Sequence, residues 1–276
     1  MREIRQAVQE TIRDADTRLT LLDVERRLSR YHRRDRSAIR SAIKELVHER
    51  ELMYVSDFGR TFIETSLHKP IRITASIVIK PPNCTVIPGA GDIVVSLGVG
   101  TSFGSGQHPT TRLCLKGLEA LLQKNAHPWV GRKSRALDIG TGSGVLIITA
   151  VKMGITLGIG LDVDPCSVSE AWANVECNGL SERITISSQA FEKSEETFDL
   201  ILANLRLPTL KNYLPQMISR MEPGGRLLLS GVKSEECDGF VGQAQSVQLN
   251  RTWMAEERGW VALIFKKQAK KRGRGS

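Results

Sequence analysis

Hydrophobic residues recur at helical spacing through the first 48 residues and predict three helices. The second helix begins at a T-x-x-D capping box, which runs from Thr20 to Asp23. The third helix begins at about Ser37. The apolar positions that define the helices are Ile4, Val8 and Ile12, then Val24, Leu28 and Tyr31, and then Ile39, Ile43, Leu46 and Val47.

Two short runs rich in β-forming residues follow in ELMYVSDFGRTFIET, around the turn SDFG, and predict a β-hairpin. Three helices followed by a hairpin resemble a winged helix-turn-helix domain, which we assign to residues 1–66. In such a domain the third helix enters a groove of nucleic acid, and here it would expose Arg36, Arg40 and Lys44. Winged helices also bind proteins or serve as scaffolds, so the role of this domain stays open.

The pattern changes at residue 67 to the strand-like runs IRITASIVIK and DIVVSLGVG. The prolines and glycines of PPNCTVIPGAG between them interrupt any helix. We therefore predict a linker or a small β extension over residues 67–94.

Strand patterns and helix patterns alternate from Arg135 to about residue 232, which is typical of a parallel sheet covered by helices on both faces. The last two strand patterns, VQLNRTWMAEE and WVALIFKK, are too close together for a crossover and predict an antiparallel hairpin. The predicted fold class is therefore α/β, with a doubly wound, Rossmann-like sheet and an antiparallel C-terminal hairpin, over residues 95–267.

A glycine-rich turn follows the first strand of this sheet, with Gly140, Gly142 and Gly144 two residues apart and Asp138 before them. A dinucleotide-binding loop would have the spacing G-x-G-x-x-G, and a P-loop would have a lysine after the glycines. Neither is present. Asp162 ends the second strand 22 residues after Gly140, where a carboxylate can accept both hydroxyls of a ribose. The turn therefore predicts a nucleoside site without a phosphate loop.

These features resemble the class I S-adenosylmethionine-dependent methyltransferases and are most similar to the ribosomal protein L11 methyltransferase family. The resemblance rests on FGSGQHPTT, LDIGTGSGVL, GLDVDP and ILANLRLPTL. It implies S-adenosylmethionine as the cofactor and Asn204 as the candidate catalytic residue. The cofactor-binding residues that we predict are Thr111, Asp138, Gly140, Gly142, Gly144, Asp162 and Asn204, with Phe103, Gly104, Gly106 and His108 shaping a loop over the cofactor.

Three residue types have competing interpretations. His108 is either a general base or a residue that begins a helix and stabilises the loop, and we favour the second. Asp164 is interpreted as a helix cap. The four tryptophans are too scattered along the sequence to form a stacking platform and are interpreted as packing residues.

The formal net charge of +9 suggests an anionic partner, such as RNA or a ribonucleoprotein. Basic residues gather between Arg26 and Arg40 and in the C-terminal tail, residues 268–276, which we predict to be disordered. No apolar run approaches the ~18 residues of a membrane helix, and the charged N-terminus indicates a cytoplasmic protein. The five scattered cysteines predict free thiols, and no metal site is expected.

The leading hypothesis is a methyltransferase that acts on a protein amine, a lysine of a ribosomal or translation-associated protein. The first alternative is an RNA methyltransferase guided by the N-terminal domain and the basic tail. The second is a regulator that binds the cofactor without catalysis. The N-terminal domain differs from the ferredoxin-like module of characterised family members, so the sequence leaves the methyl acceptor open.

Overall fold

The computed structural model describes residues 2–13, 15, 17, 19–32, 35–57, 60–66, 69–98, 104, 106, 108–122, 129, 132–191, 196–247 and 249–268. The chain forms two compact units. One comprises residues 1–71 and 83–85, and the other comprises residues 72–82 and 86–276. Phe103 and residues 269–276 of the predicted tail lie outside the described residues.

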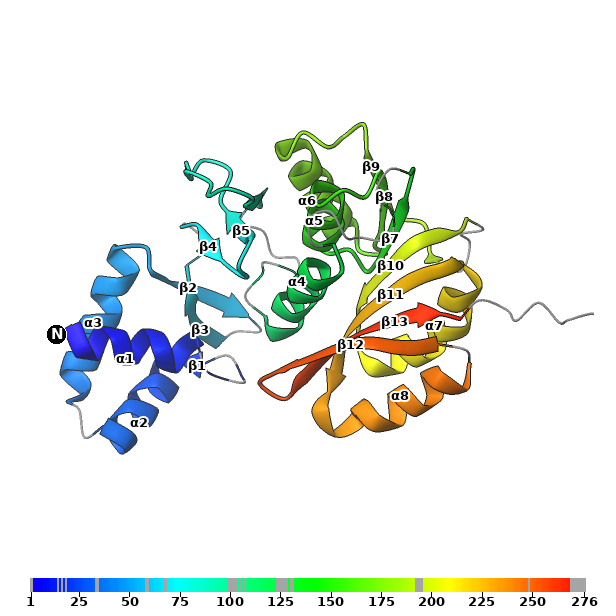
Figure 1. Ribbon diagram of the computed structural model, residues 1–276. Helices are drawn as coiled ribbons and strands as arrows, with labels where there is room; N and C mark the ends of the chain where they lie inside the picture. Colours follow the sequence, from blue (N-terminus) through cyan, green and yellow to red (C-terminus); the bar gives the residue numbers. More distant parts are fainter. Residues whose placement is uncertain are drawn as a thin grey trace, which may run out of the picture. The chain divides into compact units, whose positions relative to one another are not determined.

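The N-terminal unit has three helices and a three-stranded antiparallel sheet in the order β1-β3-β2 (Figure 1). Its elements are α1 (Arg2–Arg13), β1 (Leu19–Thr20), α2 (Leu21–His32), α3 (Arg36–His48), β2 (Leu52–Asp57) and β3 (Arg60–Thr65). The predicted helices and hairpin are present, and β1 was not predicted because two residues cannot show an alternating pattern. The assignment to the winged-helix class stays a prediction.

The start of α2 confirms the predicted capping box. The Asp23 carboxylate accepts hydrogen bonds from the Thr20 backbone N–H at 3.0 Å and from the Thr20 hydroxyl at 2.6 Å. The Asp23 N–H in turn donates to Thr20 Oγ1 at 3.3 Å. The helix therefore begins where the sequence places it, because two backbone donors at its end are satisfied locally.

The cations predicted on the outer face of α3, Arg36, Arg40 and Lys44, are all exposed. Arg40 needs one correction, because its guanidinium forms a bidentate ion pair with Glu25 of α2, which is only 1% exposed. A buried carboxylate requires a partner, so Arg40 holds α3 to α2 and is not a free charge for a ligand. The sequence pattern does not show that Glu25 is buried beneath it.

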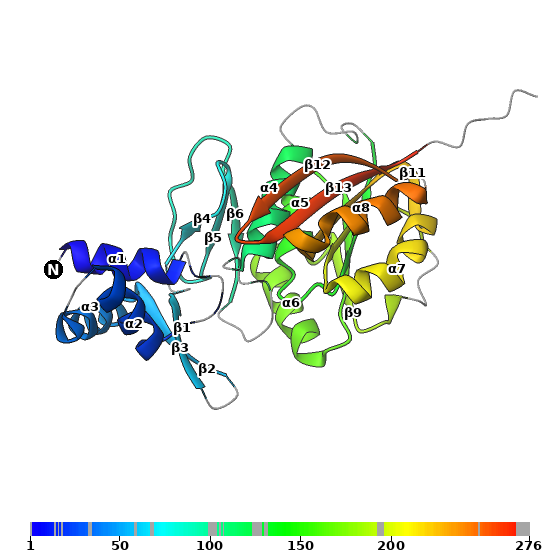
Figure 2. The same ribbon diagram turned by 90° about the horizontal axis from the view of Figure 1, so that it is seen from below.

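The second unit contains a seven-stranded sheet in the order β12-β13-β11-β10-β7-β8-β9 (Figures 1 and 2). The strands from β11 to β9 in this order are parallel, and β13 is antiparallel to both β11 and β12. The strands are β7 (Arg135–Ile139), β8 (Leu157–Leu161), β9 (Ile184–Ser187), β10 (Phe198–Asn204), β11 (Met221–Lys233), β12 (Leu249–Glu257) and β13 (Trp260–Lys267). The predicted doubly wound sheet and its C-terminal hairpin are confirmed.

Two hydrophobic clusters hold the helices to opposite faces of this sheet. The first includes α4 (Pro109–Leu121), α5 (Val145–Lys152) and α6 (Pro165–Cys177), and the second includes α7 (Leu207–Ser219) and α8 (Cys237–Ser246), which follows η2 (Ser234–Glu236). Along β10, Leu200 and Leu202 join the first cluster, whereas Ile201 and Ala203 join the second. A strand buried on both faces needs apolar residues on both, which explains the run LILA at residues 200–203. Among the described residues, no helix has the length and apolar character needed to cross a membrane.

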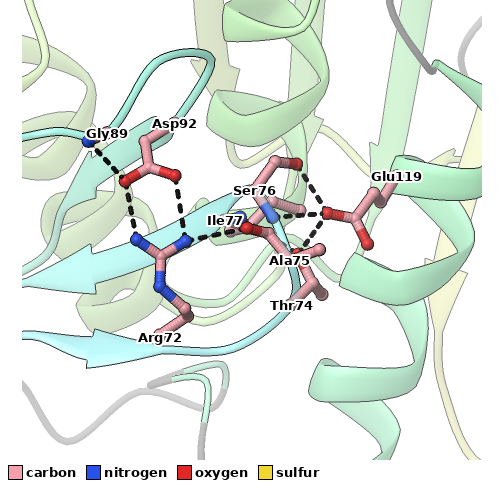
Figure 3. Close-up of polar contacts among 8 residues, drawn as sticks. All are labelled: Arg72, Thr74, Ala75, Ser76, Ile77, Gly89, Asp92 and Glu119. Atoms are coloured by element: carbon pink, nitrogen blue, oxygen red, sulfur yellow. Dashed lines mark hydrogen bonds and ion pairs between the residues drawn. The ribbon is translucent and has the colours of Figure 1, made fainter.

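A smaller sheet has the order β4-β5-β6 and contains β4 (Ile71–Arg72), β5 (Ile77–Lys80) and β6 (Ile93–Ser96). It comes from the segment expected to be a linker or a β extension. Arg72 forms two hydrogen bonds with the Asp92 carboxylate, at 2.9 and 2.7 Å (Figure 3). Glu119 of α4 accepts hydrogen bonds from Thr74 and Ser76 in the turn between β4 and β5 (Figure 3). These contacts fix the turn to α4.

We expect Glu119→Ala to lower the free energy of unfolding by about 2 kcal/mol at neutral pH, because three donors lose a charged acceptor. Burial raises the pKa of Glu119, but the hydrogen bonds from Ser76 and Thr74 outweigh it and hold the pKa below 4.5. The carboxylate is therefore stabilising above pH 4.5, and this contribution is lost as the pH falls through the lowered pKa.

Thermal unfolding from pH 3 to pH 7 measures this effect. The melting temperatures of Glu119→Ala and the natural protein should differ most at pH 7 and converge in acid. Glu182→Ala is the control, because Glu182 is exposed. A difference that grows as the pH falls would contradict the assignment.

Candidate functional site

A cavity of about 530 Å³ lies where the parallel strands of the large sheet end. Open α/β sheets bind ligands at this edge, and the volume is that of a site for a small organic molecule. The residues that line it are His108, Thr110, Ile139, Gly140, Gly142, Leu161, Asp162, Val163, Ser167, Gln189, Phe191, Asn204, Leu205, Arg206, Thr209, Tyr213, Gly231 and Trp260. All of them belong to the second unit.

The glycine-rich turn bends over the end of β8. The backbone N–H groups of Gly140 and Thr141 donate to the Leu161 carbonyl oxygen at 2.8 and 2.9 Å. Gly140 has a φ of +69°, and a Cβ atom there would come within 2.6 Å of Leu205 Cδ2. Glycine at this position therefore allows the turn to lie close to β10 and leaves space for a ligand. Gly142 also lines the cavity, whereas Gly144 is the residue before α5.

Asp162 lines the cavity directly after β8, and its carboxylate is already oriented by two backbone groups. Its Oδ2 accepts from the Gly142 N–H at 2.9 Å, and its Oδ1 accepts from the Asp164 N–H at 3.0 Å. Each carboxylate oxygen has a second lone pair, so the side chain can still accept hydrogen bonds from a ligand. Asp164 caps α6 by accepting from the Cys166 N–H at 3.1 Å, in agreement with its interpretation from the sequence.

Asp138 lies below the turn and is 1% exposed. Burial raises the pKa of Asp138 to about 7, although the hydrogen bond from Thr141 opposes the shift. Its Oδ2 accepts this bond from Thr141 Oγ1 at 2.8 Å. In the described structure Asp138 therefore supports the turn from inside, and its contact with a cofactor stays a prediction.

Asn204 and Thr111 are 93 positions apart in the sequence, and the fold brings them together. Asn204 Nδ2 donates to Thr111 Oγ1 at 3.4 Å. Thr111 is fully buried on α4, whereas Asn204 lines the cavity at the end of β10. Because the Asn204 NH₂ group donates to Thr111, the Asn204 side-chain carbonyl oxygen remains as an acceptor for a hydrogen bond from a ligand in the cavity.

Gly104, before α4, lies against the glycine-rich turn. The Gly104 carbonyl oxygen accepts from Ser143 Oγ at 2.9 Å. The φ of Gly104 is +106°, and a Cβ atom there would come within 2.7 Å of the same hydroxyl oxygen. Gly106 is buried against Ile79 of β5. A side chain at Gly104 would meet Ser143 and one at Gly106 would meet Ile79, so glycine allows the close approach at both positions.

His108 is the residue before α4, and Thr110 donates its backbone N–H to the imidazole at 3.3 Å. The ring also lines the cavity. It lies edge-on to the Trp260 ring, with 5.5 Å between centroids and 64° between planes. The helix-starting role favoured from the sequence is therefore present, next to a contact that the sequence did not indicate.

Several lining residues were missed from the sequence. Phe191 follows β9 and Tyr213 lies on α7, and their rings meet edge-on at 5.4 Å. Trp260, interpreted as a packing residue, begins β13 and lines the cavity. A polar residue after the end of a strand is a signal that could have identified Gln189, but no sequence signal marks the aromatic residues.

Metal-binding chemistry has no support in the described part of the chain, where no three His, Cys, Asp or Glu side chains gather as ligands. All five cysteines are free, as predicted. Glycine-lined space, an oriented carboxylate at Asp162 and an amide at Asn204 instead fit a nucleoside-containing cofactor.

The sheet order and this cavity define a class I S-adenosylmethionine-dependent methyltransferase fold. A model of the family described as "Ribosomal protein L11 methyltransferase (PrmA)" matches residues 36–268. The chain belongs to the ribosomal protein L11 methyltransferase family. This confirms the family inferred from the sequence and, with it, S-adenosylmethionine as the cofactor.

Two similar curated proteins are both named ribosomal protein L11 methyltransferase. The one from Geotalea uraniireducens is 34% identical over 207 residues, which are 73% of this chain and 65% of that protein. The one from Geobacter sp. strain M21 is 37% identical over 201 residues, which are 72% of this chain and 64% of that protein. The chain thus spans less than two thirds of the length of these relatives.

The fold is also that of a solved structure, a ribosomal protein L11 methylase from Lactobacillus delbrueckii subsp. bulgaricus. The two structures superimpose with a TM-score of 0.64 at 23% sequence identity. The match covers 72% of this chain and 99% of the other.

Proposed function

We propose that this protein transfers a methyl group from S-adenosylmethionine to an amine of a ribosomal protein, namely a lysine of L11. The observation that carries the proposal is the cavity at the ends of β7, β8 and β10, lined by Gly140, Asp162 and Asn204 in a chain of this family. The names of the relatives support L11 as the acceptor. We further propose a cytoplasmic location, because the acceptor is a component of the ribosome.

The cofactor supplies an electrophilic methyl group on a sulfonium, so the chain needs little acid or base chemistry. Asp162 would hold the ribose hydroxyls, and the turn around Gly140 and Gly142 would leave room for the nucleoside. The Asn204 carbonyl oxygen, oriented by Thr111, would accept an N–H of the acceptor amine and aim its lone pair at the methyl group. The amine must be neutral to react, and its proton passes to water.

The N-terminal unit is proposed as the arm that recognises the acceptor. This is the role that we assign to the predicted domain of residues 1–66, with residues 67–94 joining it to a catalytic domain of residues 95–267. The exposed side chains of Arg36 and Lys44 on α3 suit an acidic surface on a protein or on RNA. A protein acceptor is favoured over RNA because the relatives are named for a ribosomal protein.

Methyl transfer can be tested with cofactor labelled on its methyl group, in cell extract and on purified L11. We expect label that protease removes and RNase does not, and we expect L11 with its lysines replaced by arginine to remain unlabelled. The double variant Arg36→Glu/Lys44→Glu should lose transfer while binding cofactor normally. Label that only RNase removes would show an RNA methyltransferase. Cofactor binding without any transfer would show a sensor and refute the proposal.

A further inference from the structure

Trp260 lines the cavity, and its ring contacts the ammonium group of Lys233. Lys233 of β11 and Trp260 of β13 are direct partners across the two antiparallel strands. The Lys233 Nζ atom lies 3.9 Å from the centroid of the indole ring. This distance is well within the range of a cation–π interaction, for which tryptophan is the most favourable ring.

The Trp260 ring also contacts His108, at the start of α4, whose imidazole meets it edge-on with 5.5 Å between centroids. Both rings line the same cavity as Asn204. Of the other aromatic lining residues, Phe191 and Tyr213 pack against each other. Trp260 is therefore an aromatic surface held in place at the cavity that we assign to methyl transfer.

The ring is the partner of the Lys233 ammonium, because no carboxylate among the described residues forms an ion pair with it. Two other lysines of this unit bind oxygen atoms instead. Lys116 pairs with the Glu257 carboxylate at 2.7 Å, and Lys267 donates to backbone carbonyl oxygens at 2.7 and 2.6 Å. The exposed Lys233 side chain has only a weak interaction to lose, so it can exchange with another cation.

We propose that the Trp260 ring, held by His108, is the subsite that receives the alkylammonium group of the methyl acceptor, and that Lys233 competes for this ring. The inference rests on the proposed function and names the recognition element for its substrate class. A second cation on the face that Lys233 covers would have to displace it. A cation on the opposite face would be repelled by the positive charge of Lys233. The ring receives the acceptor as its ammonium ion, which then passes a proton to water before its lone pair reacts, and the protonated product amine is again a cation that suits the ring.

Binding of small cations tests the subsite without catalysis. The probe is Nα-acetyl-trimethyllysine amide, compared with its neutral tert-butyl analogue, and both are titrated into the protein saturated with S-adenosylhomocysteine. We expect the cation to bind about three- to tenfold more tightly than the neutral analogue. Lys233→Met should tighten binding of the cation by a similar factor and leave the neutral analogue unchanged. Equal binding of the two probes would overturn the proposal.

Two ring variants separate the subsite from the fold. Trp260→Leu should abolish the preference for the cation, whereas Trp260→Phe should keep part of it, since benzene retains a weaker π face. The matched controls are Trp172→Leu on α6 and Lys211→Met on α7, which are exposed and do not line the cavity. If Trp260→Leu unfolds, Lys233→Met still decides the question, and its failure to change cation binding would refute the competition.

Methyl transfer to L11 supplies an independent readout. Lys233→Met should lower KM for the acceptor about threefold with kcat unchanged, and Trp260→Phe should raise it. Failure of the proposed function has a different signature, because the natural protein would then not label L11 at all. A natural protein that labels L11 with a KM unaffected by both variants would refute the subsite alone.

Discussion

Asp162→Ala should weaken the binding of S-adenosylmethionine about a hundredfold. The variant removes charge-assisted hydrogen bonds to the ribose that together contribute about 3 kcal/mol. It also removes the acceptor of the Gly142 N–H, which at 2.9 Å helps to hold the glycine-rich turn against the end of β8. The variant should therefore lose both the hydrogen bonds to the ribose and the position of the glycine-rich turn. Calorimetry with cofactor and with S-adenosylhomocysteine measures the change.

Asp164→Ala is the matched control for this prediction. Asp164 is two residues further along and accepts hydrogen bonds from the Cys166 N–H and the Ser167 hydroxyl, both at 3.1 Å. Its loss removes the same charge from the same segment but costs about 1 kcal/mol of stability as a missing helix cap. We expect cofactor affinity to change little. Similar affinities for Asp162→Ala and the natural protein would refute the ribose assignment.

Gly231→Ala should destabilise the protein by at least about 3 kcal/mol and abolish methyl transfer. Gly231 is the bulged residue of β11, where the pairing with β13 shifts register between Ser230 and Val232. Its φ is +93°, and a Cβ atom there would overlap the carbonyl oxygen of Leu205. Because this neighbour is backbone, relief requires β10 and β11 to move apart beside Asn204.

Gly224→Ala is the control, since Gly224 lies on the same strand with a φ of +77° and has no atom within 4 Å of the position that a Cβ would take. It should cost only the conformational penalty, about 1 kcal/mol. Melting temperatures of both variants and cofactor binding at low temperature provide the comparison. Equal melting temperatures would show that the contact between Gly231 and Leu205 does not constrain the site.

Much of the second unit was predictable because its information is local. Alternating strand and helix patterns specify a parallel sheet, and the short break between the last two strands specifies a hairpin. Glycine spacing and Asp162 predict a nucleoside site in the same way, since a turn and the end of the next strand must meet at one edge of the sheet. The hydrogen bond between Thr111 and Asn204 joins residues from two separate motifs, and the contact of each with the cofactor stays a prediction.

The sequence by itself determined the fold class, the family, the cofactor and the polar residues at the strand ends. Tertiary structure alone decided that Arg40 pairs with the buried Glu25, that Gly231 lies against Leu205, and that Trp260 reaches the cavity beside Lys233 and His108. The physical reason is distance along the chain. Local patterns record how a segment folds, whereas a buried charge, a backbone contact or an aromatic ring acquires its role from partners far away in the sequence.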